Sequence, residues 1–442
     1  MHTLAQLRAG KLVGLRRLDL SAGLSEFPRE IFDLADTLEV LNLSGNALQA
    51  LPDDLPRLKH LRVLFCSDNR FTELPAVVGQ CAALDTIGFK ANRIAHVPAA
   101  ALSPQLRWLI LTDNGVTGLP AEIGRCTRLQ KLMLAGNELA QLPDEMAGCT
   151  GLELLRIAAN RLGALPRWLF DLPRLAWLAY AGNPFSDISE AEALAEHPAA
   201  RIDWSQLQLQ TVLGEGASGV IHRALWQRDT AAGPQAVAVK LFKGAVTSDG
   251  LPRSEMDACI AAGRHRHLIP IEGRVVGHPL ATPGLVMQLI DPVFRNLAGP
   301  PSLASCTRDV YAPGTRWSLD TALQMARGLA SATAHLHARG ILHGDLYAHN
   351  TLWNGDGDAL IGDFGAASFF AHDDSAISLA LQRIEARAYG CLLEELLQHC
   401  DGGADERWTR LLTLKDRCLQ TQPALRPLMR DVERELAALS PA

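Results

Sequence analysis

The sequence has 442 residues, of which 48% are hydrophobic, so it is long enough for two or three domains with real cores and is not a disordered or collagen-like chain. Its formal net charge is −6, and neither half of the chain is basic, so a nucleic-acid partner is not expected. The first residues lack a signal-like apolar core, and no stretch approaches about 18 consecutive apolar residues. A cytoplasmic location without a membrane span is therefore expected, while delivery by a specialised secretion route stays open.

After a cap expected over residues 1–14, one unit repeats from residue 15 to residue 183. Each copy carries an LxxLxLxxN string, and an irregular first copy at Leu15 brings the number of repeats to eight. The closing asparagines, 22 or 23 residues apart, are Asn46, Asn69, Asn92, Asn114, Asn137, Asn160 and Asn183. The pattern resembles a leucine-rich repeat array, in which strands bury leucines against neighbouring repeats and the asparagines bond backbone groups at the turns.

The strand positions between the leucines would form the concave face of such an array. Several of them carry large apolar side chains: Phe65, Trp108, Ile110, Met133 and Trp177. A cluster of this kind usually marks an interface, here for a protein partner or for the second domain of the chain itself. Cover by flanking repeats or by the other domain is the alternative, and it stays open.

The nine cysteines are scattered and include no CxxC pair. Cys81, Cys126 and Cys149 each stand three residues before a repeating leucine, and Cys66 replaces one. We therefore expect buried thiols rather than disulfides, and no zinc site.

Residues 184–204 depart from the repeat and are expected to form a C-terminal cap and linker with a short acidic helix. A strand-like stretch then leads into the glycine run Gly214–Val220, GEGASGV, which would let the backbone approach phosphate groups, although an ordinary hairpin also fits. The next strand, Val237–Lys240, ends in a lysine. Glu255 follows fifteen residues later in a helix-like stretch, from which it can pair with that lysine.

Further motifs follow in order. A buried strand at Leu285–Gln288 and a long helix over Leu319–Ala338 precede the string His343–Asn350, HGDLYAHN. Asp363-Phe-Gly stands thirteen residues beyond Asn350. An aspartate can accept the proton of an attacking hydroxyl, and paired amide and carboxylate oxygens suit Mg²⁺.

These motifs, in this order, resemble the eukaryotic-like protein kinase family, and the whole chain is similar to bacterial proteins that fuse leucine-rich repeats to such a domain. The resemblance implies an α/β leucine-rich repeat solenoid followed by an α+β bilobal kinase-like domain over residues 205–442. The N-lobe would span 205–287, the hinge 288–291 and the C-lobe 292–442.

The resemblance also implies ATP and Mg²⁺ as cofactors and assigns roles to residues. The catalytic set would be Asp345 as base, Lys240 paired with Glu255, and Asn350 and Asp363 as Mg²⁺ ligands. The nucleotide would contact Gly214, Gly216, Gly219, Val220, Ala238, Lys240, Met287 at the gatekeeper place, Gln288 to Ile290, and Leu352. His343 is expected to pack against Phe364 as a structural imidazole.

The sequence departs from the family pattern at four places. Gly344 replaces the usual arginine before the catalytic aspartate, so control through a phosphorylated activation segment is not expected. Tyr347 stands where serine/threonine kinases usually carry a lysine. The segment from Asp363 to Glu385 is short and lacks an APE-like triplet, and an irregular insert over 291–315 follows the hinge. This insert could shape a docking surface or be an ordinary surface loop.

The short segment contains three hydroxyl side chains, and their replacement is expected to leave turnover largely intact: Ser368, Ser375 and Ser378. Three hypotheses remain from sequence alone. In the first, the chain is a protein kinase, of the serine/threonine type by resemblance, whose repeats recruit a partner or regulate it. Alternatively, it is a small-molecule kinase of the aminoglycoside-phosphotransferase type, suggested by the HGD motif, or a catalytically silent nucleotide-binding scaffold.

Overall fold

The computed structural model describes residues 2–196, 199–216, 218–228, 233–244, 246–247, 249–401 and 405–439, so Ala217 of the glycine run lies outside the described residues. They fall into two compact units, Met1–Leu175 and Ala176–Ala442. The boundary lies inside the eighth repeat, before residue 183, where the array is expected to end. Within the described parts of both units, no helix combines the length and apolarity needed to cross a membrane.

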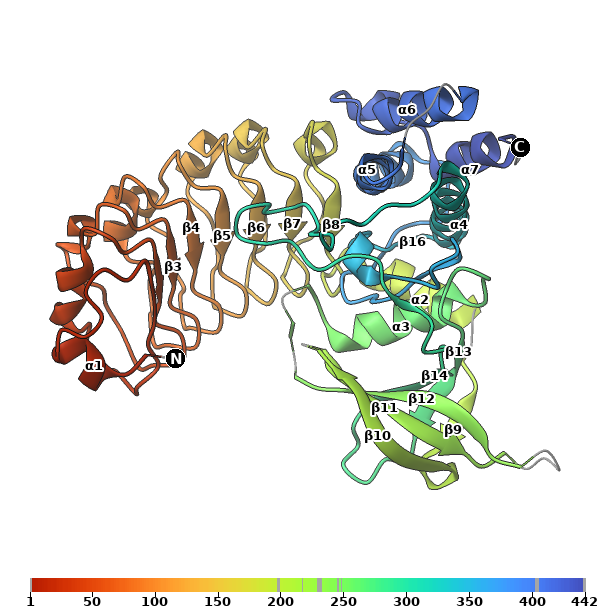
Figure 1. Cartoon of the computed structure of the whole chain (residues 1–442), viewed down its shortest axis with the longest axis horizontal. Coiled ribbons are helices and arrows are strands. Elements are labelled where there is room, and N and C mark those ends of the chain that lie inside the picture. The colour runs from red at the N-terminus through yellow and green to blue at the C-terminus, as the bar shows by residue number, and fades with distance from the viewer. Residues whose placement is uncertain are drawn as a thin grey trace. The chain divides into compact units, whose positions relative to one another are not determined.

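The first unit is a stack of short parallel strands. It opens with helix α1 (Leu4–Arg8), which Thr3 and Gln6 cap reciprocally. Each strand pairs with the next one in sequence order, and Figure 1 shows β3 to β7 side by side. The strands are β1 (Arg17–Asp19), β2 (Val40–Asn42), β3 (Val63–Phe65), β4 (Thr86–Gly88), β5 (Trp108–Ile110), β6 (Lys131–Met133) and β7 (Leu154–Arg156). The 3₁₀ turns between them are η1 (Arg29–Leu34), η2 (Leu55–Arg57), η3 (Ala76–Gln80), η4 (Ala99–Ala101), η5 (Ala121–Arg125), η6 (Asp144–Gly148) and η7 (Arg167–Asp171).

The repeated asparagines link successive turns of this unit. The Nδ2 group of Asn69 donates to the carbonyl oxygens of Leu43 at 2.9 Å and Cys66 at 3.1 Å, and its Oδ1 accepts from the backbone N–H of Leu48 at 2.9 Å. Asn137 makes the same type of contacts three repeats further on. The structural role predicted for these asparagines is confirmed.

All nine cysteines are free, and the four in the repeats are buried. Burial raises the pKa of the Cys81 and Cys126 thiols to about 11, so both stay protonated at neutral pH. The prediction of buried thiols in place of disulfides is therefore confirmed.

The second unit begins with β8 (Trp177–Ala179), α2 (Asp187–Glu196) and β9 (Arg201–Asp203), and continues into a six-stranded sheet of order β10-β11-β12-β14-β13-β9. Neighbouring strands are antiparallel except β13 and β9, which are parallel. The other strands are β10 (Leu207–Glu215), β11 (Gly219–Trp226), β12 (Gln235–Phe242), β13 (Ile271–Val276) and β14 (Gly284–Gln288), and α3 (Pro252–Ala262) follows β12. In Figure 1 the sheet and α3 form one lobe of this unit.

Helices dominate the other lobe of the second unit. They are α4 (Leu319–His337), α5 (Ala376–Gln398), α6 (Glu406–Cys418) and α7 (Met429–Ala437). Short strands surround the loops between α4 and α5: β15 (Arg295–Asn296), β16 (Ile341–Leu342), β17 (Thr351–Trp353), β18 (Ala359–Ile361) and β19 (Ser368–Phe369). Strands β15, β17 and β18 form one small sheet, and β16 pairs with β19 in another.

The segment expected as cap and linker contributes to the second unit. Helix α2 forms as predicted, and it packs against α3 and β19. The Ser254 hydroxyl of α3 donates to Glu190 of α2 at 3.4 Å. Strand β9 lies in the part expected as linker. It pairs with β13 and extends the sheet, and its single buried side chain, Ile202, joins the core of that lobe.

Candidate active site

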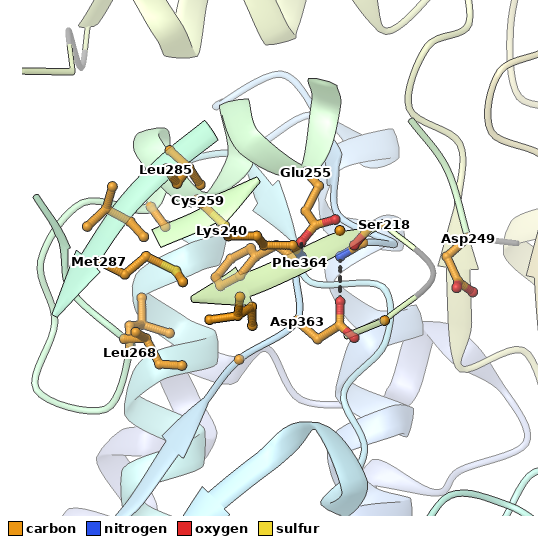
Figure 2. Close-up of a pocket in the computed structure, with 18 of the residues that line it drawn as sticks. Ser218, Lys240, Asp249, Glu255, Cys259, Leu268, Leu285, Met287, Asp363 and Phe364 are labelled. Atoms are coloured by element: carbon orange, nitrogen blue, oxygen red, sulfur yellow. Dashed lines mark hydrogen bonds and ion pairs between the residues drawn. The ribbon is translucent and has the colours of Figure 1, made fainter. Parts of the chain in front are cut away.

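A cavity of about 230 Å³ lies in the second unit between the sheet, α3 and the Asp363 loop (Figure 2). One part of its wall is apolar and includes Leu268, Leu285 and Met287. The polar part includes Lys240 and Asp363. A mostly apolar pocket with a few convergent polar groups is the usual form of a small-molecule site.

Strand β12 directs Lys240 into this cavity. Val237 and Val239 are fully buried in the core of the sheet, so the alternate residues Ala238 and Lys240 lie on the opposite face. The Lys240 ammonium forms an ion pair with Glu255 from the first turn of α3, and their side chains are only 13% and 3% exposed. Burial lowers the pKa of Lys240, but the charge and the hydrogen bond of Glu255 outweigh it and raise the pKa overall, so the lysine stays charged. The pairing predicted for these two residues is present.

The loop after β16 holds Asp345 and Asn350 together. The Asn350 Nδ2 group donates to Asp345 Oδ2 at 2.7 Å and to the Asp345 carbonyl oxygen at 3.0 Å. His343 stacks at a tilt on Phe364, with ring centroids 5.0 Å apart, and its Nε2 lies 2.9 Å from the Gly362 carbonyl oxygen. The predicted packing of His343 against Phe364 is therefore observed, and it ties this loop to the Asp363 segment.

A buried carboxylate of α5 anchors the same loop. Glu385 accepts hydrogen bonds from the backbone N–H groups of His343 at 3.2 Å and Gly344 at 2.6 Å, and from His337 Nε2 at 2.8 Å. Burial acts to raise the pKa of Glu385, but the hydrogen bond and charge of His337 outweigh burial and lower it. The loop that carries Asp345 is thus fixed by charge-assisted bonds to the helical lobe.

Asp363 lies next to Asn350, which directly precedes β17. The backbone N–H of Gly362 donates to the Asn350 carbonyl oxygen at 3.0 Å, and Asp363 itself has a positive φ of 53°. Its Oδ1 accepts from the backbone N–H of Gly365 at 3.2 Å. In the described ranges no group of three or more His, Cys, Asp or Glu side chains could hold a metal. One amide and one carboxylate fit Mg²⁺, which keeps several waters and takes substrate phosphate oxygens as further ligands.

The cavity brings together part of the predicted site. Predicted residues in its wall are Gly216, Gly219, Lys240, Glu255, Met287 and Asp363. Others lie on neighbouring elements outside the cavity wall: Gly214 in β10, Val220 in β11, Ala238 in β12, Gln288 in β14, Ile290 after β14, Asp345 and Asn350 in the loop after β16, and Leu352 in β17. Sequence reasoning missed several residues that line the cavity: Ser218, Thr247, Asp249, Cys259, Leu268, Leu285 and Phe364. The pattern that predicts a buried strand at Leu285 does not show that this residue borders a cavity, and no motif singled out the polar residues Ser218, Thr247 and Asp249.

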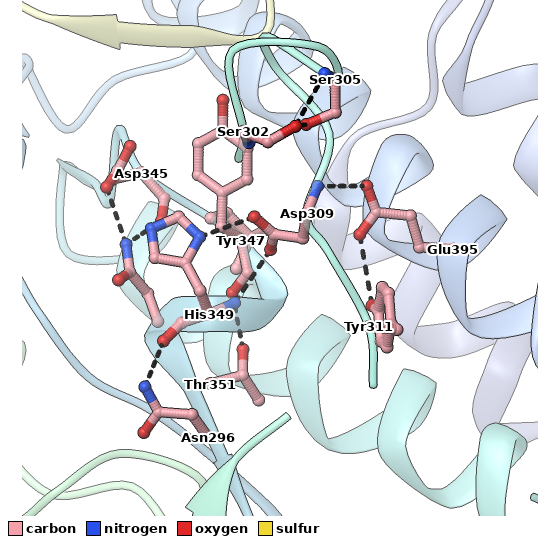
Figure 3. Close-up of polar contacts among 12 residues, drawn as sticks. Asn296, Ser302, Ser305, Asp309, Tyr311, Asp345, Tyr347, His349, Thr351 and Glu395 are labelled. Atoms are coloured by element: carbon pink, nitrogen blue, oxygen red, sulfur yellow. Dashed lines mark hydrogen bonds and ion pairs between the residues drawn. The ribbon is translucent and has the colours of Figure 1, made fainter. Parts of the chain in front are cut away.

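The insert over 291–315 is tied to the loop that carries Asp345 (Figure 3). Asp309 accepts from the backbone N–H of His349 at 2.9 Å and lies 2.7 Å from its Nδ1. Burial lowers the pKa of His349, but the hydrogen bond to Asp309 and its charge outweigh burial and raise the pKa overall. On the other side, Tyr311 donates its hydroxyl to Glu395 of α5 at 3.2 Å. The insert therefore bridges the loop and a helix, a role that its irregular sequence did not reveal.

Comparison with known proteins agrees with this geometry. Residues 207–389 match the family described as protein tyrosine and serine/threonine kinase, while residues 104–162 and 37–58 match leucine-rich repeat families. The chain carries a protein kinase domain preceded by leucine-rich repeats. The kinase domain therefore has the sheet-rich lobe, the helical lobe and the loop motifs that the resemblance implied.

Three relatives illustrate the similarity. Serine/threonine-protein kinase mos of Xenopus laevis is 28% identical over 180 residues, which cover 40% of this chain and 45% of the relative. CBL-interacting protein kinase 22 of Oryza sativa subsp. japonica is 29% identical over 199 residues, 42% of each chain. A probable LRR receptor-like serine/threonine-protein kinase of Arabidopsis thaliana is 31% identical over 179 residues, 38% of this chain and 27% of the relative. The chain spans less than half the length of these three relatives. All three are named as protein kinases, so the matches favour the protein kinase hypothesis over the small-molecule kinase hypothesis.

Proposed function

We propose that this chain is an ATP- and Mg²⁺-dependent protein kinase of the serine/threonine type. The observation that carries the proposal is the buried pair of Lys240 and Glu255 in a cavity shared with Asp363, next to a loop in which Asn350 holds Asp345. Phosphoryl transfer needs positioning and charge neutralisation more than covalent help, and this arrangement supplies both. The serine/threonine preference is supported by the names of the three relatives given above.

The proposed roles follow from the contacts of each side chain. Lys240, kept charged and oriented by Glu255, holds the α- and β-phosphates of ATP, and Gly216 and Gly219 lie over them. Asn350 and Asp363 would hold Mg²⁺, which neutralises charge on the phosphates when it is bound. Asp345 accepts the proton of the acceptor hydroxyl, and its bond to Asn350 orients the carboxylate toward that task.

We propose the same site for the adenine contacts expected from the sequence. Ala238 of β12 is paired with Met287 of β14, which supports a place for both residues on one side of the adenine ring. The proposed nucleotide site also includes Val220, Leu352, Gly214 and the backbone from Gln288 to Ile290. A cytoplasmic location and a bacterial source remain predictions.

The repeats are proposed to dock a protein partner through the apolar stripe Phe65, Trp108, Ile110 and Met133. These four side chains are partly exposed in the first unit, and the Lys131 ammonium lies 4.6 Å from the centre of the Trp108 ring. An apolar, partly acidic partner segment suits this surface. Trp177, the fifth residue of the predicted stripe, is only 1% exposed and stacks on Tyr347, so for this residue the contacts agree with the alternative that the kinase domain of the same chain covers it.

The function is tested by incubating the full chain with Mg²⁺ and ATP labelled on the γ-phosphate, alone, with generic protein acceptors and with an aminoglycoside. Label on serine or threonine of the chain or of a protein acceptor supports the proposal. Label on tyrosine alone would change the residue preference. Label on the aminoglycoside alone, or ATP binding without transfer to any acceptor, would overturn it.

A further inference from the structure

The eighth repeat strand, β8, lies against the loop that carries Asp345. The rings of Trp177 and Tyr347 stack in parallel, with centroids 4.3 Å apart and planes inclined by 6°. The Trp177 indole Nε1 donates to the carbonyl oxygen of Leu346 at 3.1 Å. Because Leu346 and Tyr347 directly follow Asp345, one tryptophan of β8 holds both the backbone and a side chain of this loop.

The residues after β8 hold a second segment of the same site. Ser368 Oγ accepts the backbone N–H groups of Tyr180 at 2.9 Å and Ala181 at 3.2 Å, and the Tyr180 hydroxyl donates to the Phe369 carbonyl oxygen at 3.0 Å. Ser368 and Phe369 form β19, just beyond the Asp363-Phe-Gly motif. Ser368 is fully buried, and the effect of its replacement on turnover stays a prediction.

Gly344 shows how closely β8 approaches the loop that carries Asp345. Its φ is +72°, and a Cβ atom there would lie 2.4 Å from the Ala366 carbonyl oxygen and 2.8 Å from the Leu178 carbonyl oxygen. No side chain fits at this contact without a shift of backbone. The arginine usual in the family at this position is therefore incompatible with the observed packing of β8.

The two segments held by β8 must keep a fixed relative position for phosphoryl transfer, because one carries Asp345 and the other follows Asp363. Strand pairing of β16 with β19 joins them directly, and Glu385 anchors His343 and Gly344 from the helical lobe. The hydrogen bonds from Trp177 to Leu346 and from Tyr180 to Phe369 add a third set of contacts that hold the two segments. Every polar contact involved is buried, so its loss would leave an unpaired group away from water.

We propose that Trp177 and Tyr180 are positioning residues for phosphoryl transfer, and that β8 permanently fixes the Asp345 loop and β19 without phosphorylation of the activation segment. The inference rests on the proposed kinase function. It assigns to one repeat of the array a direct structural part in the kinase site. Tyr347, which stands in place of the usual lysine, serves in this arrangement as the surface on which Trp177 stacks.

Conservative variants with matched controls test the proposal in the full chain. Tyr180→Phe removes one buried tyrosine hydroxyl bond to a backbone carbonyl oxygen. Tyr389→Phe removes an equivalent bond, to Ala326 at 2.9 Å, away from β8. Trp177→Phe removes the indole bond to Leu346, and Trp317→Phe removes the comparable bond to Leu396 at 2.8 Å. Trp177→Ala removes the stacking as well.

Two measurements are made on each variant: kcat and KM for ATP, and hydrogen exchange of the amides in residues 343–350 and 366–370. We expect kcat to fall at least tenfold in Trp177→Ala and severalfold in Tyr180→Phe, with KM for ATP nearly unchanged and faster exchange confined to these segments. Trp177→Phe should recover part of the activity lost in Trp177→Ala, and both controls should retain wild-type kcat.

Wild-type kcat and wild-type exchange in Tyr180→Phe and Trp177→Ala would overturn the proposal. If Trp177→Ala does not fold, Trp177→Phe and Tyr180→Phe decide the question in the same way. A wild-type chain that transfers no phosphate would refute the proposed function instead, and the exchange measurement would still decide whether β8 holds the two segments.

Discussion

Replacement of Gly344 by alanine should disrupt the site although it adds only one methyl group. The residue has a φ of +72°, which costs a side chain about 1–2 kcal/mol. The new Cβ would lie 2.4 Å from the Ala366 carbonyl oxygen, about 1 Å closer than ordinary van der Waals contact, so backbone must move. Overpacking of this kind typically costs about 1–3 kcal/mol. The total destabilisation of the loop is therefore about 2–5 kcal/mol.

Gly314→Ala is the matched control for this prediction. Gly314 has a similar φ of +79°, but a Cβ there would meet nothing within 4 Å, so this variant should lose only the cost of the positive φ, about 1–2 kcal/mol. Native-state hydrogen exchange gives the opening free energy of each loop, and kcat reports the effect on the site. Gly344→Ala should lower the local opening free energy more than Gly314→Ala does and reduce kcat at least tenfold. Equal effects in the two variants would refute the packing argument.

Three further outcomes are expected. Asp363→Ala should weaken binding of ATP in the presence of Mg²⁺, measured by calorimetry, and equal affinity in both proteins would contradict its role as ligand. Burial, followed by the charge of Asp257, raises the pKa of Glu190 from 4.5 to about 7, with Arg253 acting in the opposite direction. The Glu190 carboxyl therefore stays protonated to a higher pH in the folded chain than in the unfolded chain. Its contribution to the free energy of unfolding is complete below about pH 4.5 and is lost as the pH rises through 7. Glu190→Gln should flatten the decline of the thermal midpoint between these values, and parallel curves would argue against the shift. Ser375→Ala removes the N-cap of α5 and should lower the free energy of unfolding by about 1 kcal/mol. The kcat value should still change less than tenfold, because Gly344 has no cationic side chain that could bind a phosphate on this serine.

The sequence predicted those parts of the molecule in which residue spacing itself determines the contact. The asparagine ladder and the pairing of Lys240 with Glu255 are of this kind, since a repeat or a strand-then-helix pattern brings the residues to one place. Cavity residues such as Cys259 and Leu285 could not be distinguished from core, because burial and cavity lining give the same apolar pattern.

The contacts of β8 could not be predicted from local pattern. Trp177 occupies the same position in its repeat as Trp108 does in an earlier one, yet its partner Leu346 lies 169 residues further along the chain. The same holds for Ser368, which the sequence shows only as one of three hydroxyls in a short segment. Its hydroxyl accepts from the backbone N–H groups of Tyr180 and Ala181, which precede it by 188 and 187 positions. Asp309 and His349 are 40 residues apart and belong to an irregular insert and a loop, which no periodicity relates.

The most direct test of the kinase assignment is the phosphate transfer rate of Asp345→Asn measured beside its affinity for ATP. The asparagine keeps an oxygen that can accept the 2.7 Å bond from Asn350, so the loop should keep its shape while the proton acceptor is lost. We predict that kcat for transfer of γ-labelled phosphate falls roughly 10²–10⁴-fold while the dissociation constant for ATP with Mg²⁺ stays within about twofold. Transfer at the wild-type rate by this variant would contradict the assignment of Asp345 and of the site built around it.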